Sequence, residues 1–411
     1  MRRKHCILPL ILLLLFIAQL IPVPGVSSSA GKAGEEARMT VYFPNWNVYS
    51  NDAAQVKNLP WNRLDCVNHA FWKIAPKDDA FTLVSTDPWA DTDSANPAAH
   101  FAQYKKMAKA HPGVDILLSV GGWTCSGYFS KMCLTKESRA SFIGSCVSFL
   151  EAYPFFTGLD IDWEYPGVPR RGSGSDEGNP SLGDDKANYT LFLKELRAAL
   201  DQRFGKSKKR LTVCAAAAAD ILSHQDYAAL VPYVDRINLM TYDMAGIADG
   251  RTGHQSALLG EPSADSAVRY LVSQGVPRGK IAIGSPLYSH GWKQVDLSSG
   301  DPLGAKGKGF SGGTRLWKDL VKLEKAAVPQ GVPGWHTGYD EAAQAAYLWN
   351  DDPASGDYRV FLTYENEKSL DAKTKYIRDQ GLGGLIVWQS GGDDAEADYP
   401  LLTRAYRALH P

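Results

Sequence analysis

The feature of this sequence that most limits its possible folds is a strand-like apolar run that recurs eight times along the chain. The runs lie at residues 39–43, 64–71, 115–120, 157–164, 210–215, 236–241, 280–284 and 384–388. Most of them are separated by amphipathic stretches such as 187–204, in which apolar residues recur at helical spacing. Strand and helix alternating eight times over 411 residues predict a closed (β/α)8 TIM barrel rather than an open doubly wound sheet.

One connection is much longer than a single helix requires. About one hundred residues separate the seventh run from the eighth. Within it, residues 318–327 have a helical pattern, and residues 342–349 and 358–364 look strand-like. We therefore expect the barrel domain, residues 39–411, to carry a small α+β insertion domain on its rim between strands seven and eight, at about residues 293–360.

The N-terminus has the pattern of a secretory signal. Positively charged residues 2–4 precede an apolar run at 7–21, and the small residues 27–30 follow it. The run is shorter than the about 20 apolar residues of a membrane-spanning helix, although an uncleaved anchor is the alternative. We expect residues 1–30 to be a signal peptide, residues 31–38 to be a linker, and the mature protein to be secreted, without stable membrane association after cleavage.

Charge and cysteine content narrow the possible partners and covalent links. The formal net charge is -1 and no long basic run occurs, which argues against nucleic acid as a partner. Beyond residue 30 the chain has five cysteines, an odd number that cannot pair completely. Cys125 and Cys133 sit close together in a predicted loop and are the candidate disulfide pair. We expect the protein to be a monomer.

The fourth run carries three acids. Read with a period of two, one face consists of Leu159, Ile161 and Trp163. The opposite face consists of Asp160, Asp162 and Glu164. Stacked carboxylates repel one another and are costly to desolvate, so packing alone would not select them. A metal site fits less well, because no histidine is nearby and the nine histidines are scattered; the pattern favours acid–base chemistry.

Other candidates follow neighbouring runs. In a barrel of this kind the chemistry sits at the carboxyl ends of the strands. There the sequence offers Glu164, Tyr242 and Asp243 after the sixth run, Tyr288 after the seventh and Trp388 at the end of the eighth. Each aromatic residue alone is more often a packing residue than a ligand contact. Their convergence on one rim favours a site.

At these residues the sequence resembles glycoside hydrolase family 18, the chitinases. Residues 157–164, Thr-Gly-Leu-Asp-Ile-Asp-Trp-Glu, are similar to the family pattern Asp-Gly-x-Asp-x-Asp-x-Glu. Residues 119–122 (Ser-Val-Gly-Gly) and 240–243 (Met-Thr-Tyr-Asp) match the family motifs of strands three and six, and the resemblance covers nearly all of residues 39–400. Three departures occur: Thr157 replaces the first acid, Ser-His follows Tyr288 where Gly-Arg is common, and Gln follows Trp388 instead of an acid.

The resemblance implies a chitinase that hydrolyses β-1,4-linked N-acetylglucosamine polymers by a retaining, substrate-assisted mechanism. Glu164 would be the general acid and base, and Asp162 would hold the acetamido N–H and stabilise the developing charge. Asp160 would share a proton with Asp162, and Tyr242 would position the acetamido carbonyl. The implied substrate-binding residues are Asp243, Met240, Trp388, Trp123, Tyr42, Phe71 and Tyr288. Neither a metal nor an organic cofactor is implied.

Three alternatives stay open. An endo-β-N-acetylglucosaminidase acting on N-glycans, or an enzyme acting on peptidoglycan, would cut next to the same sugar; the long insertion favours chitin, because a tall wall deepens a groove for a linear polymer. A non-catalytic chitin-binding lectin on the same barrel would typically lack the terminal acid, which is present as Glu164. Thr157 is the feature that favours the lectin.

Overall fold

The computed structural model describes residues 37–50, 55–78, 80–246, 248–327 and 334–411. The expected signal peptide and all but the last two residues of the expected linker lie outside the described residues. None of the described helices is long and apolar enough to cross a membrane.

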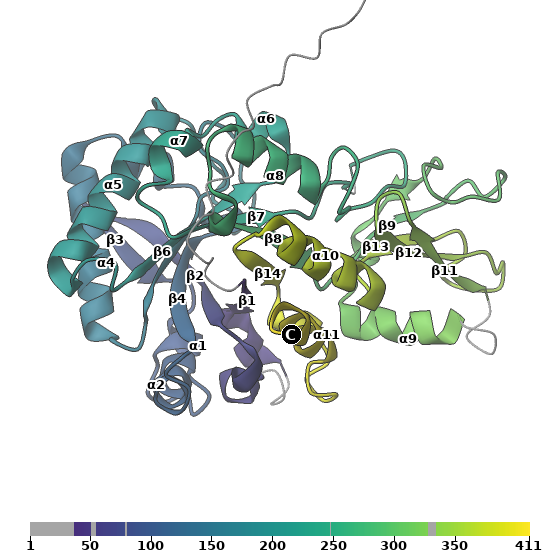
Figure 1. Cartoon of the computed structure of the whole chain (residues 1–411), viewed down its shortest axis with the longest axis horizontal. Coiled ribbons are helices and arrows are strands. Elements are labelled where there is room, and N and C mark those ends of the chain that lie inside the picture. Colours follow the sequence, from purple (N-terminus) through teal and green to yellow (C-terminus); the bar gives the residue numbers. More distant parts are fainter. Residues whose placement is uncertain (1–36, 51–54, 79, 247, 328–333) are drawn as a thin grey trace, which may run out of the picture. The chain divides into compact units, whose positions relative to one another are not determined.

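The predicted (β/α)8 barrel is confirmed (Figure 1). Its eight parallel strands are β1 (Arg38–Pro44), β2 (Cys66–Lys77), β4 (Asp115–Gly121), β5 (Gly158–Asp162), β6 (Arg210–Ala216), β7 (Arg236–Met240), β8 (Ile281–Pro286) and β14 (Gly384–Trp388). They follow one another in chain order, and pairing of β14 with β1 and of β1 with β2 closes the sheet. β3 (Ala80–Ser85) extends the sheet as an antiparallel partner of β2.

Helices cover the outside of the barrel. They are α1 (Pro88–Asp91), α2 (His100–Ala110), α3 (Phe129–Cys133), α4 (Lys136–Ala152), α5 (Asp185–Phe204), α6 (Ala219–Leu222), α7 (Tyr227–Leu230), α8 (Ala264–Ser273), α10 (Glu367–Gln380) and α11 (Pro400–Leu409). Local sequence sets their ends. The Asp184 side chain accepts a hydrogen bond from the Ala187 N–H at the start of α5, and Gly381 adopts the left-handed conformation that ends α10.

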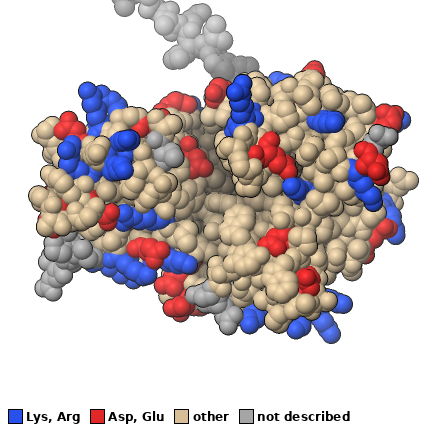
Figure 2. Space-filling view, turned by 180° about the vertical axis from the view of Figure 1, so that it is seen from behind, with Lys and Arg blue, Asp and Glu red and all other residues tan. Residues whose placement is uncertain are grey.

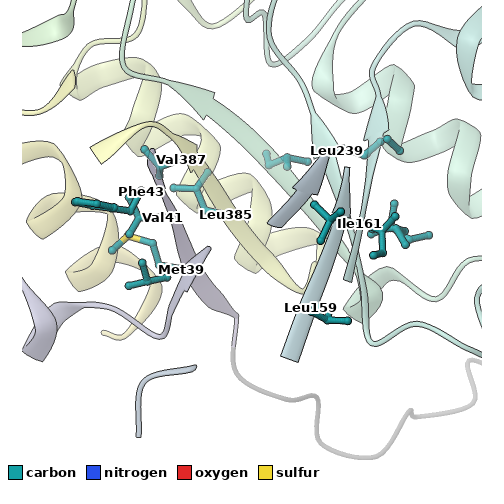
Figure 3. Close-up of a cluster of buried hydrophobic side chains, with 14 of the residues drawn as sticks. Met39, Val41, Phe43, Leu159, Ile161, Leu239, Leu385 and Val387 are labelled. Carbon is teal, nitrogen blue, oxygen red and sulfur yellow. The ribbon is translucent and has the colours of Figure 1, made fainter. Parts of the chain in front are cut away.

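Alternation along the strands separates the packing residues from the site. Met39 and Val41 of β1 lie opposite Leu385 and Val387 of β14, and Figure 3 shows these side chains together in the layer between strands and helices. Ile161 of β5 belongs to the same core. Because side chains alternate, residues of the other parity point into the barrel. The sequence therefore turns the acids of β5 inward.

The long connection before β14 forms a second sheet. Its five strands, in the order β10-β9-β13-β12-β11, are β9 (His290–Lys293), β10 (Lys308–Gly309), β11 (Trp335–Asp340), β12 (Ala345–Asn350) and β13 (Phe361–Tyr364). The expected helix is α9 (Trp317–Ala327), and the two strand-like stretches are β12 and β13. The sheet spans residues 290–364, slightly more than the expected 293–360, and lies beside the barrel (Figure 1).

The expected disulfide is wrong. Cys125 and Cys133 are both free thiols. The predicted loop is instead a short 3-10 helix (Trp123–Cys125) followed by α3, and Cys133 is buried in the hydrophobic core. Cys125 stays near the surface, where its Sγ lies 3.6 Å from the Thr124 hydroxyl.

Charges of both signs are interspersed on the surface. Figure 2 shows one face of the molecule with a hollow across its middle that is lined mostly by uncharged residues.

Candidate active site

A small cluster of side chains fills the inside of the barrel. Its buried members are Tyr42, Ala70, Cys214, Met240, Ala282 and Ile386, and Phe71, Tyr165, Tyr242 and Trp388 pack against them. These residues come from different strands or from the segments that directly follow them. Five residues predicted from the sequence are therefore in one place: Tyr42, Phe71, Met240, Tyr242 and Trp388.

Asp160 is fully buried and held by side chains from four other strands. Its Oδ2 accepts hydrogen bonds from Tyr42 Oη (2.9 Å) and Ser119 Oγ (2.8 Å). Its Oδ1 accepts from Thr212 Oγ1 (2.5 Å) and Asn238 Nδ2 (3.0 Å). These hydrogen bonds fix both oxygens of the Asp160 carboxyl group inside the barrel, so the group is satisfied although it is buried.

Asp162 stands one inward position further along β5 and is only 3% exposed. Its Oδ1 has no hydrogen-bond partner among the described residues. Burial, followed by the charges of Glu164 and Asp160, raises the pKa of Asp162 well above its usual range. No hydrogen bond joins the two aspartates in the described part of the chain, so the shared proton stays a prediction.

Glu164 follows the end of β5, where its backbone N–H donates to Ser126 Oγ (2.9 Å). Burial raises the pKa of Glu164 to about 7, and the charge of Asp243 adds to this. A hydrogen bond with Tyr165 and the charge of Arg170 act in the opposite direction. A carboxyl group that titrates near neutral pH can both give and take a proton, which is what a general acid and base must do.

Asp243 lies on the same rim, directly after Tyr242. Its Oδ1 accepts a hydrogen bond from Tyr288 Oη (2.6 Å) and lies 3.0 Å from His290 Nε2. The Tyr242 ring lies against Gly284, where a Cβ would come within 2.7 Å of it. Burial raises the pKa of Tyr242 well above its usual range, so its hydroxyl keeps the proton and can donate.

Aromatic surfaces flank this pocket. The ring of Trp388 stacks on Phe71 at 5.5 Å and contacts Tyr42 and Trp46. Trp46 is 46% exposed, and Trp123, which follows β4, is 49% exposed. Flat, accessible rings of this kind are surfaces on which sugar rings can lie.

Trp123 stands apart from the cluster of aromatic rings. The guanidinium of Arg170 lies 3.8 Å from the centroid of its indole and also donates to the Trp123 carbonyl. Arg170 is held in turn by Asp176 (2.5 Å). One face of the Trp123 ring is therefore occupied by a cation.

Sequence reasoning missed several residues that complete the site. Those that surround Asp160 are Ser119, Thr212, Cys214 and Asn238, and those at the rim are Trp46, Ser126, Tyr165, Arg170 and His290. The parity rule that placed Asp160 could have found the first group. Ser119 and Thr212 lie directly beside Asp160 in the strand register.

One further group of side chains could offer three ligand atoms to a metal ion among the described residues: His69, Asp91 and His100. All three are fully buried, in the hydrophobic core rather than on the rim. Asp91 already accepts hydrogen bonds from His69 Nε2 (2.8 Å), Trp72 Nε1 (2.7 Å) and Ser85 Oγ (2.5 Å). This network satisfies a buried carboxylate and ties α1 to β2 and β3.

Comparison with known proteins gives consistent matches. The family model for glycosyl hydrolases family 18 matches residues 38–393. Chitinase A of Pseudoalteromonas piscicida is 30% identical over 428 residues, which cover 86% of this chain and 50% of that protein. The chain thus spans about half the length of this curated relative.

Solved structures of glycoside hydrolases have the same fold as this chain. Chitinase ChiA74 from Bacillus thuringiensis superposes with a TM-score of 0.78 at 26% identity, over 92% of this chain and 70% of that one. A glycoside hydrolase family 18 N-acetylglucosaminidase from Paenibacillus barengoltzii superposes with a TM-score of 0.72 at 28% identity, over 91% of this chain and 100% of that one.

Proposed function

This chain belongs to glycosyl hydrolases family 18, and from this membership and the geometry of the site we propose that it is a chitinase that hydrolyses β-1,4-linked N-acetylglucosamine polymers. The observation that carries the proposal is that the three acids on β5 and at its end differ in hydrogen bonding and in pKa. Asp160 is saturated with donors, Asp162 keeps an unpartnered oxygen, and Glu164 at the rim has a pKa raised to about 7 by burial.

The first step cleaves the glycosidic bond. Glu164 donates its proton to the glycosidic oxygen, and the carbonyl oxygen of the substrate's own acetamido group attacks C1 as the C1–O bond breaks. The unpartnered Oδ1 of Asp162 accepts the acetamido N–H, which fixes the carbonyl in the attacking orientation. The Tyr242 hydroxyl supports that carbonyl from the other side, and the carboxyl group of Asp160 lies deeper in the same barrel.

The second step restores the sugar. The product of the first step is a cyclic oxazolinium ion, whose positive charge is stabilised by the carboxyl groups of β5. Glu164, now deprotonated, takes a proton from a water molecule that attacks C1 and opens the ring. C1 has been attacked twice from alternate faces, so the product keeps the β configuration. The chain supplies the acid and base, the substrate supplies the nucleophile of the first step, and water is the nucleophile of the second.

The aromatic residues suit the binding of a linear sugar polymer. Trp388, with Phe71 and Tyr42 behind it, forms a floor inside the barrel mouth, and Trp46 and Trp123 present exposed rings on the rim. Asp243, Met240 and Tyr288 would complete the sugar contacts. The second sheet rises beside this rim, and we propose that it forms a wall of the binding groove.

The test is a product profile. Purified protein is incubated with a hexamer of N-acetylglucosamine and, separately, with a high-mannose glycopeptide. We expect shortened oligomers whose new reducing ends are first β-anomers, detected by proton NMR, and an intact glycopeptide. Fully deacetylated oligomers should stay uncut, because an amine offers no carbonyl to attack. Cleavage of the glycopeptide alone would indicate the N-glycan activity, and binding without cleavage would indicate a lectin.

We also propose that the chain is exported and acts as a secreted monomer. The charged start, apolar run and small residues within positions 1–30 support export. Mass spectrometry of protein recovered from the culture medium should find an N-terminus near residue 31. Recovery of the full-length chain from the membrane fraction would indicate an uncleaved anchor instead.

A further inference from the structure

The imidazole ring of His290 lies between two groups that can only accept hydrogen bonds. Its Nδ1 lies 3.0 Å from the carbonyl oxygen of Ala245, and its Nε2 lies 3.0 Å from Asp243 Oδ1. A backbone carbonyl and a carboxylate have no hydrogen to give. Both ring nitrogens must therefore carry hydrogen for both contacts to form, and a ring with two N–H groups is the charged imidazolium.

From this contact geometry we propose that His290, in its charged form, is a positioning residue that holds Asp243 in place for the substrate. The inference deepens the proposed function and rests on it. When His290 loses a proton, one of its two contacts loses its hydrogen. Either the ring is released from Ala245, or its lone pair faces the carboxylate of Asp243. We call the two contacts of the charged His290 ring, to Ala245 and to Asp243, the clamp; in both cases the clamp on Asp243 is weakened.

Asp243 needs such a clamp. Its side chain is 54% exposed, and its backbone has a φ of 59°, in the left-handed region that non-glycine residues rarely adopt. The contacts that orient its carboxylate are the hydroxyl of Tyr288 and the ring of His290. Because the charge of Asp243 also raises the pKa of Glu164, its position bears on both the sugar contact and the acid.

The surroundings of the ring favour the charged form. His290 is 15% exposed and belongs to β9, opposite Thr363 of β13, which does not titrate. The charges of Asp243 and Asp249 act on the ring from the segment after β7, and the Tyr288 ring lies 5.7 Å from it. In β10, Lys308 lies opposite Lys293 in the strand register rather than opposite His290. Burial lowers the pKa of His290, but the hydrogen bond and charge of Asp243, the hydrogen bond to Ala245 and the charge of Asp249 together outweigh this, so its pKa is raised.

The sequence offers a matched control. The position is occupied by His290 where arginine is common in the family, and arginine stays charged at every working pH. His290→Arg should therefore keep the clamp at all pH values, whereas His290→Gln should lack it at all pH values. The wild type should behave like the arginine variant at low pH and like the glutamine variant at high pH.

Two measurements test the proposal. KM for a soluble N-acetylglucosamine tetramer is followed from pH 5 to 9 in the three proteins. We expect KM of the wild type to rise about fivefold as the ring deprotonates, that of His290→Gln to be raised throughout, and that of His290→Arg to stay flat, since one charge-assisted hydrogen bond is at stake. Wild-type and His290→Arg profiles that coincide would overturn the proposal.

The second measurement does not depend on activity. The imidazole carbon and nitrogen signals of His290, assigned as those absent from His290→Gln, are titrated by NMR in the wild type and in Asp243→Asn. We expect titration above the usual histidine range in the wild type and a lower midpoint in Asp243→Asn. An unchanged midpoint would overturn the clamp. A chain that neither binds nor cuts the tetramer at any pH would refute the proposed function while this titration still decided the role of His290.

Discussion

The chain buries two aspartates, Asp91 and Asp162, whose carboxyl groups differ in hydrogen bonding. Asp91 lies in the core, and each of its carboxylate oxygens receives at least one hydrogen bond from His69, Trp72 or Ser85. Asp162 lies inside the barrel, and its Oδ1 has no hydrogen-bond partner among the described residues. A buried polar group without a partner is costly. For these two acids, the satisfied carboxylate of Asp91 suits a structural role, and the unpartnered oxygen of Asp162 suits a role in binding a ligand.

The largest effect should come from the acid at the open end of β5. Glu164→Gln keeps the shape of the side chain but removes its transferable proton. We expect kcat on N-acetylglucosamine oligomers to fall by about 10² to 10⁴-fold, with the melting temperature unchanged or raised. A steady-state assay beside a thermal melt checks both. Turnover within about tenfold of wild type would place the acid elsewhere.

Asp91→Asn tests the buried hydrogen-bond network around Asp91. The amide cannot accept from Trp72 Nε1 and from His69 Nε2 while its own NH2 finds an acceptor, so donors would face one another in the core. We expect the free energy of unfolding to fall by about 3 kcal/mol, while kcat per folded molecule stays unchanged. Urea denaturation measures the first, and active-site titration corrects the second. An unaltered midpoint would contradict a structural role.

The same isosteric change at Asp162 should have the opposite outcome. Asp162→Asn removes a buried carboxyl group that is crowded by Asp160 and Glu164, so stability should be unchanged or slightly higher. Turnover should fall by about 10²-fold, because a direct stabiliser of the developing charge is lost. Parallel denaturation and kinetic measurements on the two asparagine variants would show whether the losses separate as expected.

The activity should follow the titration of Glu164 on its alkaline side. The protonated form is the general acid, and its pKa is raised to about 7 by burial. As the pH rises above that value, kcat should fall by about tenfold per unit, since the acid form then decreases tenfold per unit. A pH series from 5 to 9 in the His290→Arg background separates this limb from the effect on KM. A fall in kcat that begins near pH 4.5 would mean that burial does not raise the pKa of Glu164.

The smallest effect should be at Thr157, where the family signature lacks its first acid. The Thr157 hydroxyl accepts from the Ile116 N–H (3.1 Å) and bonds the Ile116 carbonyl, so it faces the backbone of β4 rather than the carboxylates. We expect Thr157→Asp to change turnover by less than about tenfold. Thr157→Ser is the matched control, since it keeps the hydroxyl. A large gain with aspartate would favour the lectin.

The periodicity of apolar residues predicted most of the barrel strands. Strands 39–43, 115–120 and 384–388 are mostly apolar because both faces of a barrel strand are covered. Alternation along residues 157–164 also placed Asp160 and Asp162 on the inward face. It could not find β9 or β11, which are short and mix polar residues with aromatics. Such strands owe their conformation to their neighbours in the sheet rather than to their own residues.

The partners of the acids were harder to predict. Asn238 and Tyr42 reach Asp160 across 78 and 118 residues of sequence. Parity shows that such residues face inward, but not which of them meet, because this depends on strand register. The mistaken pairing of Cys125 with Cys133 has the same origin, since closeness along the chain does not say which way a buried thiol points.

The contact between His290 of the second sheet and Asp243 of the barrel has a consequence for protein engineering. His290 is the first residue of β9, so the ring that holds Asp243 is carried by the second sheet, whereas Asp243 itself follows a barrel strand. A chimera that exchanges residues 290–364 for the corresponding sheet of a relative would therefore also replace part of the active site. To exchange the second sheet and keep the contact between His290 and Asp243, the splice must leave Tyr288 and His290 with the host barrel.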